Sequence, residues 1–241
     1  MSYARALPTA NADGTTIATP SRTGRYSEAY TLPVTGKELF FADEGSQFVA
    51  VNPTMGTGIV GHAAATTFDE AKALLVIYNG NTAASGIRVY PQSILLDVTV
   101  VGVGHTRDQF SFTLDTGNRV SSAGTALTKA NLNMDSGVTS GAIVTFGAVV
   151  TTAATTSRRL LGNYVVRGAN IEVVWDQFEF IFGAPGGSTG GLLTPTTVAT
   201  HFTRCLPPVV IGPGQSLCVH QWAASQSTGI TFEPVINYVE R

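Results

Sequence analysis

Strict alternation of apolar and polar residues constrains the fold of this chain more than any other feature. In residues 110–115, three apolar side chains alternate with serine, threonine and aspartate. In residues 94–101, one parity is entirely apolar and the other is mixed. A period of two residues places the apolar side chains on one face of a β-strand. Both segments are therefore predicted to be strands of antiparallel sheets, each with one buried face.

Three further segments are predicted to be strands. Residues 141–152 are rich in β-branched residues and glycine, which indicates a tightly packed, buried strand. Residues 69–78 begin like a capped helix but end in Leu-Leu-Val-Ile-Tyr before an Asn-Gly turn, which favours a strand. In residues 171–182 the apolar parity changes, so a bulge or turn is required near Asp176 and Gln177.

The strand count and spacing predict an all-β protein. About eight to ten strands, the last running almost to Arg241, are separated by turn signals at intervals typical of sandwiches. No internal repeat is present that would indicate a propeller or solenoid. We therefore expect a jelly-roll-like antiparallel β sandwich over residues 46–241, preceded by an extended N-terminal arm over residues 1–45.

The predicted arm contains three prolines and no periodic apolar pattern. Its aromatic and basic residues are suited to lying along another protein surface, because Tyr and Arg give much contact at modest entropic cost. The contact candidates, for a capsid or a second subunit, are Arg22, Arg25, Tyr26 and Tyr30. A disordered leader is the alternative interpretation.

Charged residues make up 12% of the chain, about half of the ~25% that is usual in globular domains. Because charge-poor surfaces are typical of interfaces, part of the surface is expected to be covered by copies of the chain or by a partner. The net charge of −2 argues against nucleic acid as a partner. The sequence has no run of ~18 apolar residues and no signal-peptide pattern. We therefore expect that the protein is made in a cytoplasm and does not associate with a membrane.

The strongest enzymatic pattern is Asp115-Thr116-Gly117 at the end of an apolar strand, as in aspartic proteases. That chemistry needs two carboxylates that share a proton. The second candidate, Asp135, follows after only twenty residues, too few to build another lobe. The sequence therefore predicts no enzyme.

No cofactor or metal site is expected. The glycine-rich residues 183–191 lack the Lys-Ser/Thr ending of a phosphate-binding loop. The four histidines, His62, His105, His201 and His220, belong to no metal-binding motif, and His220 is expected to be half-buried.

Two further sets of residues have open interpretations. Cys205 and Cys218 are interpreted as buried thiols rather than a disulfide across a hairpin. Four arginines are candidates for pairing with carboxylates of another subunit, although ordinary surface positions, which contribute little to stability, are the favoured interpretation. These are Arg119, Arg158, Arg159 and Arg167.

Residues 43–59, DEGSQFVAVNPTMGTGI, combine a short β run, a turn at Pro53 and the glycines Gly56 and Gly58. We expect this segment to lie where the arm meets the first body strands and to fix the angle at which the arm leaves the body.

Six segments share their order and character with one known family. They are GRYSEAYTLPVTGKELFFADEGSQFVAVNPTMGTGI (24–59), LLVIYN (74–79), GNRVSSAGTALTKANLNM (117–134), GAIVTFGA (141–148), PPVVIGPGQSLCVHQWAASQST (207–228) and FEPVINYVER (232–241). Together they resemble structural proteins of tailed-phage virions. The resemblance spans almost the whole chain from Gly24 and rests on motif order.

The resemblance implies a head decoration or cement protein, whose arm grips the major capsid protein while the jelly-roll body projects from the outer surface of the head. It also implies a homo-oligomer, with a trimer favoured over a dimer, because several arms bind with high effective concentration. The alternative is a tail-associated, receptor-binding jelly roll that holds glycans on Trp222, Tyr164 or Tyr90.

Overall fold

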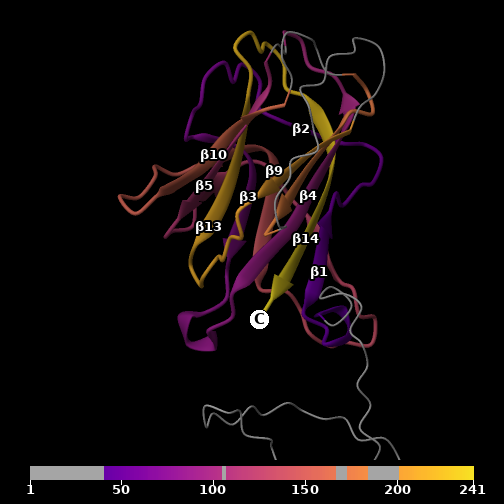
Figure 1. Ribbon diagram of the computed structural model, residues 1–241, viewed down its shortest axis with the longest axis vertical. Coiled ribbons are helices and arrows are strands. Elements are labelled where there is room, and N and C mark those ends of the chain that lie inside the picture. The colour runs from indigo at the N-terminus through magenta and orange to yellow at the C-terminus, as the bar shows by residue number, and fades with distance from the viewer. Residues whose placement is uncertain (1–40, 105–106, 167–172, 184–200) are drawn as a thin grey trace, which may run out of the picture. The chain divides into compact units, whose positions relative to one another are not determined.

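Two largely antiparallel β-sheets packed face to face make up the described part of the chain (Figure 1). The computed structural model describes residues 41–104, 107–166, 173–183 and 201–241. Within them, Phe41–Arg241 form one compact unit, and no described helix is long and apolar enough to cross a bilayer.

The strands are β1 (Gln47–Val51), β2 (Ile59–Val60), β3 (Lys72–Asn79), β4 (Val89–Val100), β5 (Gln109–Asp115), β6 (Val120–Ser122), β7 (Thr125–Ala126), β8 (Thr128–Asn131), β9 (Ala142–Thr151), β10 (Arg159–Val165), β11 (Gln177–Phe182), β12 (His201–Leu206), β13 (Ser216–Trp222) and β14 (Thr231–Glu240), with a 3₁₀ helix η1 (Ala83–Ser85). Ten of these described strands have five or more residues, which agrees with the predicted eight to ten. The short strands β2, β6, β7 and β8 are additional to that prediction.

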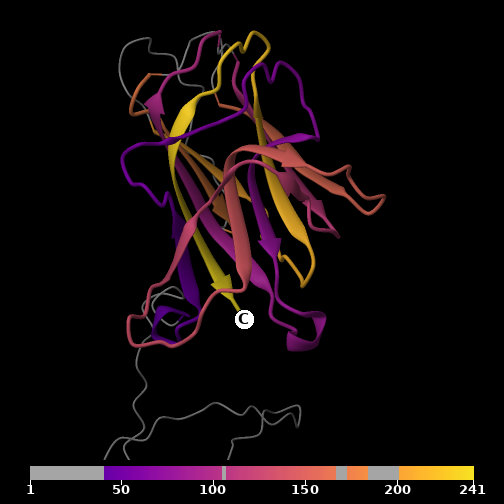
Figure 2. The ribbon, with the colours of Figure 1, turned by 180° about the vertical axis from the view of Figure 1, so that it is seen from behind.

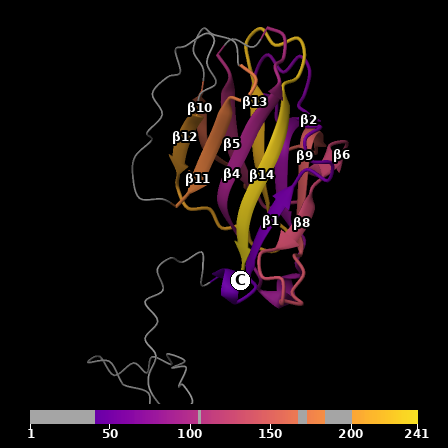
Figure 3. The ribbon, with the colours of Figure 1, turned by 90° about the vertical axis from the view of Figure 1, so that its right-hand side faces the viewer.

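The strand order is that of a jelly roll. The first sheet has the order β12-β11-β4-β14-β1-β8, with β2 beside β14, and the second has the order β10-β5-β13-β3-β9-β6, with β7 beside β9. Figure 3 shows the strands of the first sheet side by side. Eight of these strands form the jelly roll: β1, β3, β4, β5, β10, β11, β13 and β14. When they are counted from one to eight in this order, the first sheet contains the first, eighth, third and sixth strands. The second sheet contains the second, seventh, fourth and fifth strands. This is the arrangement of two Greek keys in a jelly roll, so the predicted fold is confirmed.

The core between the sheets is built from the alternating apolar residues. Phe110 and Phe112 of β5 face Phe180 of β11, with ring centroids 5.1 and 4.9 Å apart. All three rings are fully buried. Edge-to-face packing of this kind stabilises a pair by about 0.5–1.5 kcal/mol beyond the burial of apolar area. The predicted strands at residues 94–100 and 110–115 are thus confirmed as β4 and β5.

The predicted parity change before β11 is confirmed as a turn. The Val173 N–H donates to Asp176 Oδ2 at 2.7 Å, and the Asp176 N–H donates to the Val173 carbonyl at 3.0 Å. Trp175 within this turn has a φ of 76°. The turn changes which side chains face inward, so Trp175 before it is 69% exposed while Phe178 and Phe180 after it are buried in the core.

Residues 69–78 and the last strand also behave as predicted. Lys72–Asn79 form β3, and β14 lies between β4 and β1 in the middle of the first sheet. From behind, β14 is the yellow strand that runs down to the C-terminus (Figure 2).

Three details differ from the expectations. β12 is parallel to β11, whereas only antiparallel neighbours were expected. In β9, Ile143 and Val150 are 46% and 39% exposed, so this strand is not wholly buried. On β5 the polar side chains are buried as well, since Ser111, Thr113 and Asp115 are 6%, 0% and 1% exposed.

The segment 43–59 forms β1, a turn and the start of β2. The Glu233 carboxylate holds the turn, since its Oε2 accepts hydrogen bonds from Asn52 Nδ2 at 3.0 Å and from the Gly58 N–H at 3.1 Å. Residues 1–40 lie outside the described residues, so the predicted arm and its angle to the body stay predictions.

Candidate functional site

The contact candidates of the arm, Arg22, Arg25, Tyr26 and Tyr30, lie outside the described residues, as do Arg167, His105 and residues 184–191 of the glycine-rich loop. The candidate sites among the described residues therefore lie in the sandwich.

Asp115 ends β5 beneath the loops that cover the outer face of the second sheet. Its Oδ2 accepts hydrogen bonds from Arg119 Nη1 at 2.8 Å and from the Thr155 N–H at 3.0 Å. Its Oδ1 accepts from the Thr116 N–H at 2.7 Å and from the Thr155 hydroxyl. Burial acts to raise the pKa of Asp115, but the bonds from Thr155, Thr116 and Arg119 outweigh burial and lower it. Asp115 is thus an ionised carboxylate with both oxygens occupied.

Arg119 joins Asp115 to two other loops. Its side chain is buried, its Nε donates to the Thr152 carbonyl at 3.0 Å, and its Nη2 donates to Glu70 Oε2 at 3.2 Å. Glu70 also forms an ion pair with Arg158. Arg119 and Arg158 therefore pair with carboxylates of their own chain, and the buried Arg119 does not fit the favoured interpretation as an ordinary surface residue.

This geometry does not fit an aspartic protease. The carboxylate of Asp115 pairs with a guanidinium, and among the described residues no second carboxylate bonds to it. With 1% exposure and both oxygens occupied, it leaves no room for a carboxylate from a second subunit. Asp135 lies in the exposed loop after β8. A dyad that shares one proton is therefore not formed.

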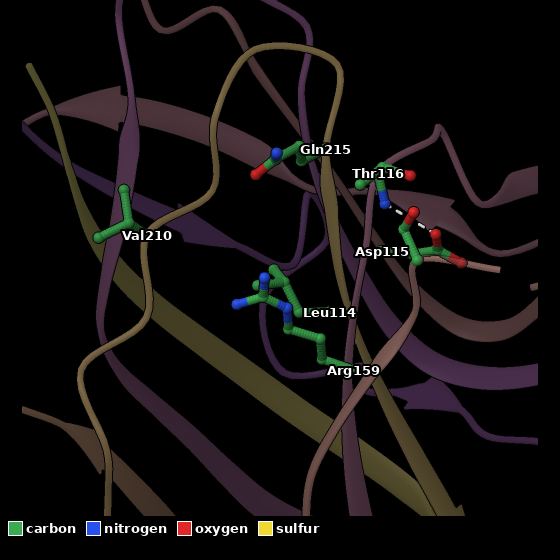
Figure 4. Close-up of a pocket in the computed structure, with 7 residues that line it drawn as sticks. Leu114, Asp115, Thr116, Arg159, Val210 and Gln215 are labelled. Carbon is green, nitrogen blue, oxygen red and sulfur yellow. Dashed lines mark hydrogen bonds between the residues drawn. The ribbon is translucent and has the colours of Figure 1, made fainter. Parts of the chain in front are cut away.

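A cavity of about 310 Å³ lies beside Asp115, at the end of β10 (Figure 4). It is lined by Leu114, Asp115, Thr116, Ser157, Arg159, Val210 and Gln215. β10 places Arg159 opposite Leu114 in register, and β13 begins directly after Gln215. Sequence reasoning named Arg159 but missed Val210 and Gln215, because their segment reaches β5 only through the pairing of β13 with β5.

The cavity presents hydrogen-bond donors. Gln215 Oε1 accepts the Gly212 N–H at 2.9 Å, and within the described residues no hydrogen bond engages the amide Nε2. Both carboxylate oxygens of Asp115 already accept hydrogen bonds from the chain. Arg159 has no ion-pair partner among the described residues. The site can therefore bind an acceptor with negative charge.

A second group of charges lies on the outer face of the first sheet. Asp97 of β4 is opposite Gln177 on one side and Glu233 on the other. Burial raises the pKa of Asp97, and the negative charge of Glu233 adds to the effect, while Gln177 and His201 oppose it. His201 pairs with Glu179 at 3.2 Å. In the described part of the chain, no three His, Cys, Asp or Glu residues are grouped so as to hold a metal ion.

The three aromatic residues of the glycan alternative do not form one site. Trp222 donates from Nε1 to Ser111 Oγ at 3.1 Å on the outer face of the second sheet. Tyr164 packs against Phe112 of the core, with ring centroids 5.9 Å apart. Tyr90 lies in the other sheet, opposite Val239. A glycan site would therefore use one of these three residues and not all of them together.

His220 is fully buried rather than half-buried, because the ring of Phe68 covers it at 5.1 Å. Its Nδ1 lies 3.1 Å from the Lys72 carbonyl, which can only accept, so the proton is on Nδ1. Burial lowers the pKa of His220 to about 4, and the imidazole is neutral at physiological pH.

Cys205 and Cys218 are thiols without a disulfide, as predicted. They lie on β12 and β13, which belong to different sheets, and Cys205 is only partly buried. Burial raises the pKa of Cys218 to about 12, so its thiol is not a reactive nucleophile.

No family model, curated protein or solved structure matches this chain.

Proposed function

We propose that this protein is a non-enzymatic structural protein of a tailed-phage virion, which decorates and stabilises the icosahedral head by binding the major capsid protein. The proposal starts from the virion-like motifs of the sequence. The jelly-roll sandwich supports it, since this fold provides a compact body that projects from a surface. The ion pair of Asp115 with Arg119 also supports it, since a paired carboxylate does not suit the aspartic protease alternative.

The observation that carries the proposal is the surface at the N-terminal end of β1. Residues 41–46 contact the end of β8 and the loop 132–141 there: Asn131 Nδ2 donates to the Gly45 carbonyl at 2.8 Å, and Asn133 Nδ2 donates to the Asp43 carbonyl at 3.0 Å. Both segments lie at the end of the sandwich where β14 finishes (Figure 1).

This loop exposes apolar side chains. Leu132, Met134 and Val138 are 45%, 95% and 54% exposed. Neighbouring exposed apolar residues mark interaction surfaces. The end of the body at which residues 1–40 join therefore also offers side chains that a capsid subunit would bury, and we assign this end to the capsid.

A homo-oligomer on the outer surface of the head, a trimer in our proposal, would combine several such ends. Each contact then needs only modest affinity, because the first one raises the effective concentration of the others. Many weak contacts across neighbouring capsid subunits would stabilise a head filled with DNA.

Binding to empty heads tests the proposal. We expect removal of residues 1–40 to leave the oligomer intact but to abolish most binding, and Met134→Ser combined with Leu132→Ser to weaken binding about tenfold or more. Met55→Ser is the matched control, since Met55 is 76% exposed but lies in the turn held by Glu233. Unchanged binding of both test variants, or density for the protein on the tail alone in electron micrographs of the virion, would overturn the proposal.

A further inference from the structure

The cavity at the end of β10 has a positive charge that no carboxylate of the described residues neutralises. In the adjoining network, the carboxylates of Asp115 and Glu70 are matched by the guanidinium groups of Arg119 and Arg158. Arg159 is additional to this balanced set and has no ion pair in the described part of the chain. The side of the cavity that Arg159 lines is therefore electropositive.

The lining combines donors with apolar surface. Besides the guanidinium, the Gln215 amide and the Ser157 hydroxyl line the cavity, while Leu114 and Val210 supply aliphatic walls. Figure 4 shows Arg159, Leu114, Val210 and Gln215 arranged around the space. A guanidinium binds a carboxylate through two parallel hydrogen bonds, and aliphatic walls favour a short apolar stem behind that carboxylate.

The position of the cavity favours a protein segment over a free small molecule. β10 is the last strand of the second sheet among the described strands, so one edge of its backbone has no strand partner there. Leu160 and Val165 on β10 are 64% and 36% exposed. An extended chain can add to such an edge by backbone hydrogen bonds while one side chain enters a neighbouring pocket.

We propose that the cavity binds the carboxylate of a Glu or Asp side chain from an extended segment of a partner protein, with Arg159 as the charged anchor and Gln215 and Ser157 as further donors. The inference concerns the chemistry of this one site and does not depend on the assignment to a phage head.

Titration of the full chain, followed by NMR of the Arg159 Nε–H and the Gln215 side-chain amide, tests the proposal. The probes are the blocked tripeptide acetyl-Val-Glu-Val-amide, its neutral analogue acetyl-Val-Gln-Val-amide, glutarate and inorganic phosphate. We expect both signals to shift with the glutamate peptide, and the neutral analogue to bind about tenfold or more weakly. Added salt should weaken the binding.

Substitutions distinguish binding at this site from a general effect of charge on the protein surface. Arg159→Gln should lose binding about tenfold or more, whereas Arg88→Gln, which removes a charge from another exposed position, should not. Val210→Glu should also block the site, because its own carboxylate would reach Arg159. Val210 is 42% exposed, so this variant is expected to fold.

Each other result counts against the proposal. Equal binding of the two peptides, or unchanged binding after Arg159→Gln, would overturn a carboxylate site. Glutarate binding as tightly as the glutamate peptide would overturn the protein segment in favour of a small carboxylic acid, and tighter binding of phosphate would overturn carboxylate selectivity.

Discussion

Arg119 organises the outer face of the second sheet. Its guanidinium bonds to Asp115, to Glu70 and to the Thr152 carbonyl, and so connects three loops that are far apart in the sequence. A buried charge is costly unless every partner is present. The stability of these loops should therefore depend on this one side chain.

We predict that Arg119→Met lowers the free energy of unfolding by about 3–5 kcal/mol, because it leaves the buried Asp115 carboxylate without its counter-ion. The double variant Asp115→Leu with Arg119→Met should lose less, since no lone carboxylate remains at position 115. Urea unfolding of the three proteins measures the difference. A double variant that is less stable than Arg119→Met would contradict this account.

His220 should give the protein a pH-dependent stability. Its folded pKa is lowered from 6.5 to about 4, so the unfolded chain takes up the proton first as the pH falls. Its contribution to stability is complete above pH ~6.5 and is lost toward pH ~4, where proton linkage makes the loss about 3 kcal/mol. His220→Asn should flatten the dependence of the unfolding free energy on pH in this window, as measured by urea titrations. His201→Asn, at an exposed position, is the control; equal slopes in wild type and His220→Asn would refute the prediction.

At the scale of elements, the turn between β1 and β2 shows how a sequence motif acquires its geometry. Asn52 and Gly58 bond to the same oxygen of Glu233, which lies on β14 and is distant in the sequence. Pro53, Gly56 and Gly58 predict a turn at this place, but its conformation depends on β14.

The two glycines of this turn should differ in their tolerance of alanine. Both have positive φ, which costs about 1 kcal/mol for a residue with a Cβ. At Gly58 the added Cβ would also lie 2.4 Å from Thr99 Oγ1 and 2.6 Å from Thr231 Cγ2, whereas at Gly56 nothing lies within 4 Å. We expect Gly56→Ala to cost about 1 kcal/mol and Gly58→Ala about 2 kcal/mol or more in chemical denaturation. Equal losses would show that backbone strain alone matters.

The edge strands were the elements that sequence reasoning missed. β10 and β12 lie at one edge of each sheet, and most residues of both are exposed or only partly buried. With one neighbour each, they need no clean alternation of apolar and polar residues. Central strands such as β4 and β5 were predictable because every second side chain faces the core and has to be apolar.

At the scale of the whole molecule, the core formed by the described residues belongs to the compact unit from Phe41 to Arg241. We predict that residues 41–241 alone unfold in one cooperative transition, with a melting temperature within a few degrees of that of the full chain. Calorimetry of both proteins provides the measurement. A broad transition, or one lowered by about 10 °C or more, would mean that residues 1–40 contribute to the core.

Residue order alone predicts the fold class, the central strands and the turn before β11, because these follow from local alternation and turn chemistry. The roles of the polar residues and the state of the two cysteines depend on the tertiary structure, which places Cys205 and Cys218 in different sheets. The sequence around Asp115 would be the same if this residue were catalytic, exposed or paired. In the folded chain Asp115 is paired with Arg119, whose side chain also bonds to Glu70 and Thr152 in distant loops. The same folding leaves Arg159 without a partner among the described residues, because charge balance is set by contacts in space and not by order along the chain.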